Sequence, residues 1–346
     1  MLKNRPLLFS AGLLLCMLAL SFCLIALSDK VTLLPGTKLG NSEVLELDPQ
    51  QKFPRQIIDP IGRAINLPAP PVSVVSGVLA SDEMLSKLLE PTRVSSVTDL
   101  VDDPGISNVA GFYPRTVLRN HGSIEEFIAA EPDLAVVAAY SNATSVELLL
   151  ATGIPLIRFA NYHSYDDLRS NVRTLAKALG SEKRAERWLV ELDSRIDVVQ
   201  QRIAGKTKPR VLSYSMSGST AGPGSLTDET IRLAGGVNVI SELGLKGYTK
   251  ISPEVAISLL PDVILVNDWS TKKGPSARDI LLNHPAWQDV PAVKNKRIYS
   301  IQGAWVTSVT PYRVKGIEQV AHLLHPSIFS ANDSPQAEAA NHQTSL

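Results

Sequence analysis

Side chains suited to holding a bound molecule recur in segments that follow predicted strands. Aromatic rings on loops suit a large planar or macrocyclic ligand, and arginine suits the carboxylates of such a ligand. A turn, packing or solvent role is the alternative for each of them, and a single loop histidine is more often solvated than bound to metal. The candidate ligand contacts are Tyr113, Arg115, His121, Tyr140, Asn142, Tyr162 and His163 in the first half, and Ser217 in the loop 217–224, Tyr248, Trp269, Trp305 and Arg313 in the second.

Motifs for covalent catalysis are missing from the sequence. No Gly-x-Ser-x-Gly elbow occurs, and the loop SGSTAGPG has a glycine spacing that fits neither a dinucleotide-binding motif nor a P-loop. We therefore assign no catalytic residue and expect that the protein is not an enzyme. A site for a bare metal ion needs three or four converging ligands, whereas the chain has six histidines and no histidine-rich loop. We assign no metal ligand and no resident cofactor, and a free-metal binding protein stays open as an alternative.

Charge and the N-terminal segment restrict the partners and the location. The 34 basic and 34 acidic side chains balance, so no net field attracts nucleic acid. Two basic residues precede an apolar run over 7–27, which is typical of a secretory signal at 1–28. The run is also long enough to be an uncleaved membrane anchor, and the choice stays open. We expect a periplasmic or extracytoplasmic protein that meets the membrane only through this segment; both cysteines, Cys16 and Cys23, lie in it.

Strand and helix patterns alternate along the body of the chain, which favours an α/β fold with mainly parallel sheets. Residues 164–205 differ, because they show only helical patterns, broken at Gly180 and followed by one apolar stripe. The stripe comprises Trp188, Leu192, Ile196, Val199 and Ile203. We predict a tether at 29–52, an N-terminal α/β lobe at 53–163, a bridging helical segment at 164–205, a similar C-terminal lobe at 206–326 and a disordered tail at 327–346.

A short segment of the sequence recurs in similar form at an offset of 129 positions. Residues 123–137 read SIEEFIAAEPDLAVV, and residues 252–266 read SPEVAISLLPDVILV. Each predicts a helix capped by serine and ended near a Pro-Asp pair, followed by a strand that is buried on both faces. Two such units also occur by chance in α/β proteins, and that is the alternative interpretation. The matching order of elements around both copies favours two related lobes on either side of one long helix.

Four motifs, one of them present in two copies, resemble the substrate-binding proteins of ABC importers for ferric siderophores, haem and cobalamin. They are FPRQIIDPIGRAINLPAPPVSVVSGVLASDEML (53–85), the two repeat copies, TDETIRLAGGVNVI (227–240) and TPYRVKGIEQVAHLLHP (310–326). The resemblance implies two lobes joined by a rigid backbone helix, with the ligand held between them. The transported ligand would contain iron or cobalt.

The same resemblance implies a role for the repeated glutamates, Glu125 and Glu254. Each would lie on the outer tip of one lobe and dock onto basic residues of an ABC permease dimer. Both occupy the second position of a helix, where the helix dipole favours a carboxylate, so stabilisation of the helix end is the alternative. A membrane-anchored interaction module with this fold and no transported ligand is the other function that stays open.

Overall fold

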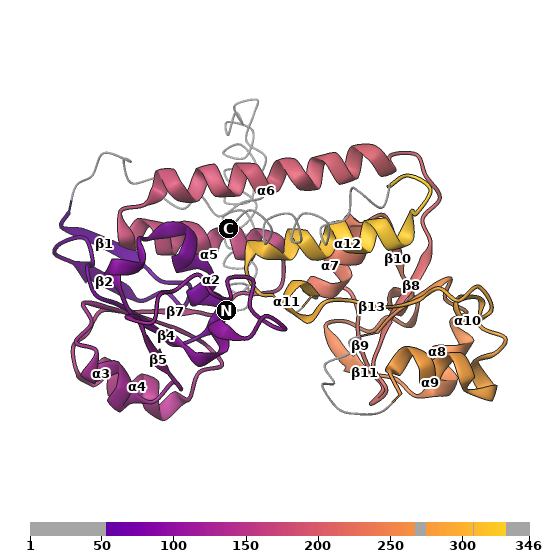
Figure 1. The fold of residues 1–346 in the computed structure, drawn as a ribbon, viewed down its shortest axis with the longest axis horizontal. Coiled ribbons are helices and arrows are strands. Elements are labelled where there is room, and N and C mark those ends of the chain that lie inside the picture. The colour runs from indigo at the N-terminus through magenta and orange to yellow at the C-terminus, as the bar shows by residue number, and fades with distance from the viewer. Residues whose placement is uncertain (1–52, 267–274, 307, 330–346) are drawn as a thin grey trace, which may run out of the picture. The chain divides into compact units, whose positions relative to one another are not determined.

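Two parallel sheets organise the chain in the computed structural model, which describes residues 53–266, 275–306 and 308–329 (Figure 1). The first sheet has the order β5-β4-β3-β6-β7 and all its pairs are parallel. The second has the order β10-β8-β12-β13, again all parallel. The predicted α/β class with two similar lobes is therefore confirmed.

The N-terminal lobe is built around the first sheet. Leu134–Ala138 of β6, an inner strand of this sheet, are buried on both faces, as the uninterrupted apolar run predicts. An antiparallel hairpin, β1 and β2, precedes the sheet. The elements are β1 Arg55–Ile58, β2 Ala64–Leu67, β3 Val74–Ser76, α2 Leu79–Leu88, η1 Pro91–Arg93, β4 Val94–Thr98, η2 Asp99–Asp102, β5 Leu118–Asn120, α3 Ile124–Ala129, β6 Leu134–Ala138, α4 Ala143–Ala151 and β7 Leu156–Phe159.

The C-terminal lobe repeats this plan and adds a small antiparallel pair, β9 and β11. Its closing helix α12 begins at Val314, after a turn of 3₁₀ helix over Pro311–Arg313. The elements are β8 Arg210–Tyr214, β9 Ser219–Ala221, α7 Leu226–Leu233, β10 Val237–Asn238, η3 Val239–Leu243, β11 Tyr248–Lys250, α8 Pro253–Ser258, β12 Val263–Val266, α9 Ala277–Asn283, η4 Pro285–Trp287, α10 Pro291–Lys294, β13 Ile298–Ser300, α11 Gly303–Val306, η5 Pro311–Arg313 and α12 Val314–Leu324.

Two helices connect the lobes. Helix α5 (Tyr165–Leu179) starts at a capping box of Ser164 and Asp167 and ends at Gly180, whose φ of 69° is left-handed, so the predicted break is confirmed. Helix α6 (Glu182–Ile203) then packs against α5, against α2 of the first lobe, and against α7 and α12 of the second (Figure 1). All five residues of its predicted apolar stripe are buried.

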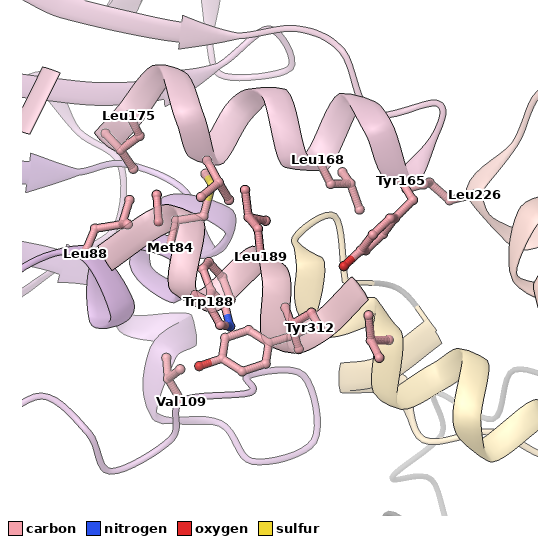
Figure 2. Close-up of a cluster of buried hydrophobic side chains, with 14 of the residues drawn as sticks. Met84, Leu88, Val109, Tyr165, Leu168, Leu175, Trp188, Leu189, Leu226 and Tyr312 are labelled. Atoms are coloured by element: carbon pink, nitrogen blue, oxygen red, sulfur yellow. The ribbon is translucent and has the colours of Figure 1, made fainter. Parts of the chain in front are cut away.

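One apolar core runs through both lobes along α6. Figure 2 shows side chains from α2, α5 and α6, including Met84, Leu168 and Leu189, packed in one cluster with Tyr312 of η5. The rings of Trp188 and Tyr312 lie 5.4 Å apart at 58°. Because a continuous core resists shear between the elements that share it, α6 holds the inner parts of the two lobes together.

The repeat is equally clear in the backbone. The residue before each Pro-Asp pair is left-handed, with φ of 44° at both Glu131 and Leu260. The aspartate that follows then accepts a hydrogen bond from the start of a neighbouring strand: Asp133 Oδ1 from Ser73 N at 3.1 Å, and Asp262 Oδ2 from Arg210 N at 2.9 Å. The Pro-Asp pair therefore turns the chain out of the helix and sets the register of the strand beside it in both lobes.

Candidate ligand-binding site

Two tyrosines lie together at the carboxyl ends of neighbouring strands in the first sheet. Tyr140 follows β6 and is 64% exposed, while Tyr162 follows β7 and is partly buried. Strands β6 and β7 are adjacent, so their ends bring the two rings to a centroid distance of 5.9 Å with a tilt of 46°. The Tyr162 hydroxyl has no hydrogen-bond partner among the described residues, and burial raises the pKa of this tyrosine.

A residue of the second lobe completes this group. Val309, in the loop before η5, packs with Tyr162 against Val78 and Ala138, which lie just beyond β3 and at the end of β6. The candidate site is thus an aromatic and apolar group to which both lobes contribute, at the strand ends where α/β proteins hold their ligands. Tyr140, Tyr162 and Val309 are called the tyrosine cluster below.

The second lobe presents Ser217 and Tyr248 on its surface. Ser217 Oγ lies 2.9 Å from Ser215 Oγ and 3.1 Å from Ser219 Oγ in the exposed turn between β8 and β9. Tyr248 begins β11, which pairs with β9, and is 70% exposed. Both side chains are therefore accessible to a ligand. Ser217 lies just after β8, and Tyr248 lies on the neighbouring antiparallel pair of β9 and β11.

Three of the predicted contacts lie in the interior instead. Tyr113 is buried and its hydroxyl donates a hydrogen bond to the backbone oxygen of Asp82 at 2.6 Å. Trp305, on α11, is also buried. These side chains already have packing or hydrogen-bonding roles in the folded chain.

Arg313 is the third buried residue, and its guanidinium is only partly satisfied. Nε donates to Thr230 Oγ1 and Nη1 donates to the backbone oxygen of Ser308, both at 2.9 Å, whereas Nη2 has no partner among the described residues. Burial lowers the pKa of Arg313 to about 10, against the opposing effects of Tyr248 and Glu229. The residue nevertheless stays charged at neutral pH.

His121 is committed to neighbouring carboxylates. Its Nδ1 lies 3.0 Å from Glu126 Oε1, and its backbone N donates to Glu126 Oε2 at 2.9 Å. The bond with Glu126 raises the pKa of His121, and the same bond holds the pKa of Glu126 at about 2. His121 thus ties the end of β5 to the first turn of α3.

The remaining predicted contacts are spread over the surface. Arg115 is exposed, Asn142 caps α4 by accepting a hydrogen bond from Ser145 N at 3.0 Å, and the backbone N of His163 donates to Asp167 Oδ2 at 2.8 Å. Trp269 lies outside the described residues. Among the predicted contacts in the described part of the chain, Tyr140 and Tyr162 are the only two whose rings contact each other.

Sequence reasoning missed two buried acids, Asp82 and Glu83, on α2. Thr98 donates hydrogen bonds to the carboxylate of Asp82 from its backbone N and, at 2.5 Å, from Oγ1. These bonds favour the charged form, but burial outweighs them and raises the pKa of Asp82 to about 7. Burial also raises the pKa of Glu83. The only signal was their place among small and apolar residues in LASDEML, and the structure buries the whole stretch from Ala80 to Ser86.

The repeated glutamates lie where the pattern places them. Ser123 and Ser252 cap α3 and α8, so that Glu125 and Glu254 each occupy the second helical position, and both are exposed. A hydrogen bond with Ser252 lowers the pKa of Glu254, which keeps this carboxylate charged. The two lobes therefore offer equivalent exposed anions.

Metal-binding and membrane-spanning features were also sought. Within the described ranges, no group of three or more His, Cys, Asp or Glu side chains is placed to hold a metal ion. No helix in that same part of the chain is both long and apolar enough to cross a bilayer.

Comparison with known proteins gives a consistent result. The chain is 22% identical over 292 residues to an uncharacterized ABC transporter substrate-binding lipoprotein of Bacillus subtilis, covering 80% of this chain and 87% of that one. It is 20% identical over 274 residues to the vitamin B12-binding protein of Vibrio parahaemolyticus, covering 76% and 89%. Its fold is similar to the periplasmic haem-binding protein RhuT of Roseiflexus sp. RS-1, with a TM-score of 0.61 at 24% identity, covering 74% and 99%.

The sequence profile of one family spans most of the folded body. The profile of the periplasmic binding proteins matches residues 74–304, from the first strand of the first sheet to α11 of the second lobe. The relatives named above are binding proteins rather than enzymes. This agrees with the lack of catalytic motifs in the sequence of this chain. Because this match covers more than half of the sequence, the chain belongs to the periplasmic binding protein family.

Proposed function

We propose that this protein captures an iron chelate (a siderophore or haem) or a corrinoid between its two lobes, outside the cytoplasmic membrane, and delivers it to an ABC permease. Membership of the periplasmic binding protein family supports the binding role. Relatives named for vitamin B12, ferric hydroxamate and haem support this range of ligands. Iron or cobalt would enter as part of the cargo.

The tyrosine cluster is the observation that carries the proposal. An exposed ring at Tyr140, a second ring at Tyr162 and an apolar contact from Val309 suit a large planar or macrocyclic ligand better than a small ion. Tyr248 on the other lobe supplies a further exposed ring. Since α6 holds the inner parts of the lobes in one core, recognition would use a largely preformed surface.

A binding panel tests the ligand. The full chain is titrated with haem, cobalamin, a ferric hydroxamate and a ferric catecholate, followed by visible spectra and by quenching of the four tryptophans. We expect one of these to bind, and we expect Tyr140→Ala to weaken that binding by about tenfold. Val190→Ala, which removes an equally exposed apolar side chain on α6, is the matched control and should bind normally.

Failure of every ligand to bind a folded sample would overturn the proposal. The chain would then be better described as an interaction module that shares the fold. Binding of bare zinc or manganese alone would instead support a free-metal binding protein.

Delivery is tested through Glu125 and Glu254. Their exposed carboxylates on equivalent helices suit basic residues on a two-fold symmetric permease. Reversal of both charges to lysine should abolish ligand uptake in cells and leave the dissociation constant of the ligand unchanged. Glu147→Lys, a charge reversal on exposed α4, is the control. Normal uptake by the double variant would contradict the docking role.

A further inference from the structure

Glu83 is buried between segments that lie far apart in the sequence. Its side chain belongs to α2 and the residue is 2% exposed. Oε1 accepts two hydrogen bonds from Asn108, from the backbone N at 2.8 Å and from Nδ2 at 2.9 Å. Oε2 lies 2.6 Å from Thr310 Oγ1 and 3.2 Å from Ser308 Oγ. Both carboxylate oxygens are therefore used.

The hydroxyl donors come from the opposite lobe. Each hydroxyl has one hydrogen, so Thr310 donates to Glu83 at the shorter distance, and the hydrogen of Ser308 is shared between Glu83 and Thr310 Oγ1, which lies 2.8 Å away. The backbone N of Thr310 donates to Ser308 Oγ at 3.2 Å. A single carboxylate thus organises the whole segment 308–310.

Asn108 extends the same network to a second segment of the C-terminal lobe. Its Nδ2 also donates to the backbone oxygen of Ala304 at 2.8 Å, and the backbone N of Ala304 donates to Gly105 O at 3.0 Å. Other bonds join the two connecting helices to the C-terminal lobe: α5 to α7 through Tyr165 N and Glu229 Oε2, and α6 to α12 through Arg195 and Glu318. Those bonds are made between helices. The bonds of Glu83 are made instead to the loop 308–310, which contributes Val309 to the candidate site.

Segment 308–310 contributes one residue to that site and is also bonded to the buried Arg313. Val309, between the two hydroxyl residues, is the contribution of the C-terminal lobe to the tyrosine cluster. The backbone oxygen of Ser308 accepts the bond from Arg313 Nη1. Because the carboxylate holds the residues on both sides of Val309, it sets where Val309 packs against Val78 and Ala138, the residues that Tyr162 also packs against.

We infer that Glu83 is a positioning residue, which holds the loop 308–310 of the C-terminal lobe against the N-terminal lobe and so sets the separation of the two sides of the candidate site. The inference rests on the proposed function only in assigning the tyrosine cluster to ligand binding. A buried carboxylate that loses its donors, or donors that lose their carboxylate, leave unpaired polar groups, so the network forms or breaks as a unit.

Distance measurements between paired spin labels test this without any ligand. The only two cysteines, Cys16 and Cys23, are replaced by serine in the full chain, and cysteines for labelling are introduced at exposed Glu147 on α4 and Ser258 on α8. The variants are Glu83→Leu, Glu83→Gln and Thr310→Val. Leu281→Ala, which opens a cavity in the core of the C-terminal lobe alone, is the control for a loss of stability without a loss of contact between lobes.

We expect Glu83→Leu and Thr310→Val to raise the population outside the wild-type distance peak by roughly tenfold or more, as the loss of a hydrogen bond to a charged group does. Glu83→Gln should restore most of the wild-type distribution, because its amide oxygen can accept from Asn108 and its amide nitrogen can donate to the hydroxyl oxygens. Leu281→Ala should leave the distribution unchanged.

A wild-type distribution in Thr310→Val and in Glu83→Leu would overturn the inference. If Glu83→Leu does not fold, the result for Thr310→Val decides alone. Because no ligand is added, this outcome is independent of the binding panel: the panel can fail while the distances change, and the distances can stay constant while a ligand binds.

Discussion

Replacement of Asp82 by asparagine is expected to change how the stability of the protein depends on pH. Asp82 is fully buried beneath the ends of two strands, near Ser76 of β3 and bonded to Thr98 of β4. Burial disfavours the charged carboxylate more than these bonds favour it, so the pKa rises from 3.8 to about 7. Asparagine has nearly the shape of the protonated acid and cannot ionise.

The sign follows from the two protonation states. Between pH 3.8 and about 7 the folded chain keeps the proton of Asp82, whereas the unfolded chain has released it. Stability from this group is therefore fully present below pH 3.8 and is lost as the pH rises toward 7. Each pH unit costs about 1.4 kcal/mol, so the loss over the whole window is on the order of 4 kcal/mol.

Denaturant unfolding of both proteins at pH 4, 5, 6, 7 and 8 measures this effect. The free energy of unfolding of Asp82→Asn, relative to the wild type, should rise by about 4 kcal/mol from pH 4 to pH 8. Comparison of the two proteins cancels the titration of other groups. Glu147→Gln, which neutralises an exposed carboxylate on α4, is the matched control. A constant difference between Asp82→Asn and wild type across this range would refute the argument, since Asp82 would then be ionised in the folded protein throughout.

Three further changes test the packing and the helix caps. Leu189→Ala, in the core that α6 shares with both lobes, should lower the free energy of unfolding by about 2–5 kcal/mol in denaturant titrations, and a loss below about 1 kcal/mol would mean that the lobes do not depend on this core. Gly222→Ala would place a methyl group 2.4 Å from the backbone oxygen of Leu245, so a cost of about 1–3 kcal/mol is expected, and a neutral result would show that the segments next to the β9–β11 pair shift freely. Ser123→Ala removes the side-chain cap on Glu126 N at 3.3 Å and should cost about 1 kcal/mol, measured in the same way; an unchanged midpoint would show that Glu126 alone secures the start of α3.

Much of the fold was predictable because its signals are local. The capping serine at 123, the Pro-Asp pair at 132–133 and the glycine at 180 each act on backbone groups within a few residues, and the structure places all three as the pattern predicts. The apolar stripe of α6 was equally predictable, since the spacing of residues along a helix determines which of them lie on the same side. The matched positions of Glu125 and Glu254 follow from the same local rules.

Burial of polar side chains was not predictable in this way. Tyr113 and Arg313 follow predicted elements in the sequence much as Tyr140 and Tyr248 do, yet the first two are buried and the last two are exposed. What separates them is the packing of other segments over each loop, and the spacing of residues within the loop carries no information about those segments.

The sequence by itself therefore determined the alternation of helices and strands, the long helix between the lobes and the relationship between the two lobes, because hydrogen bonding and periodicity at short range specify these. Only the tertiary structure decided which side chains form the candidate site and which hold it in place. Glu83 and Thr310 are bonded across 227 positions of chain. Such a contact depends on how whole lobes pack, and no local pattern in either segment encodes it.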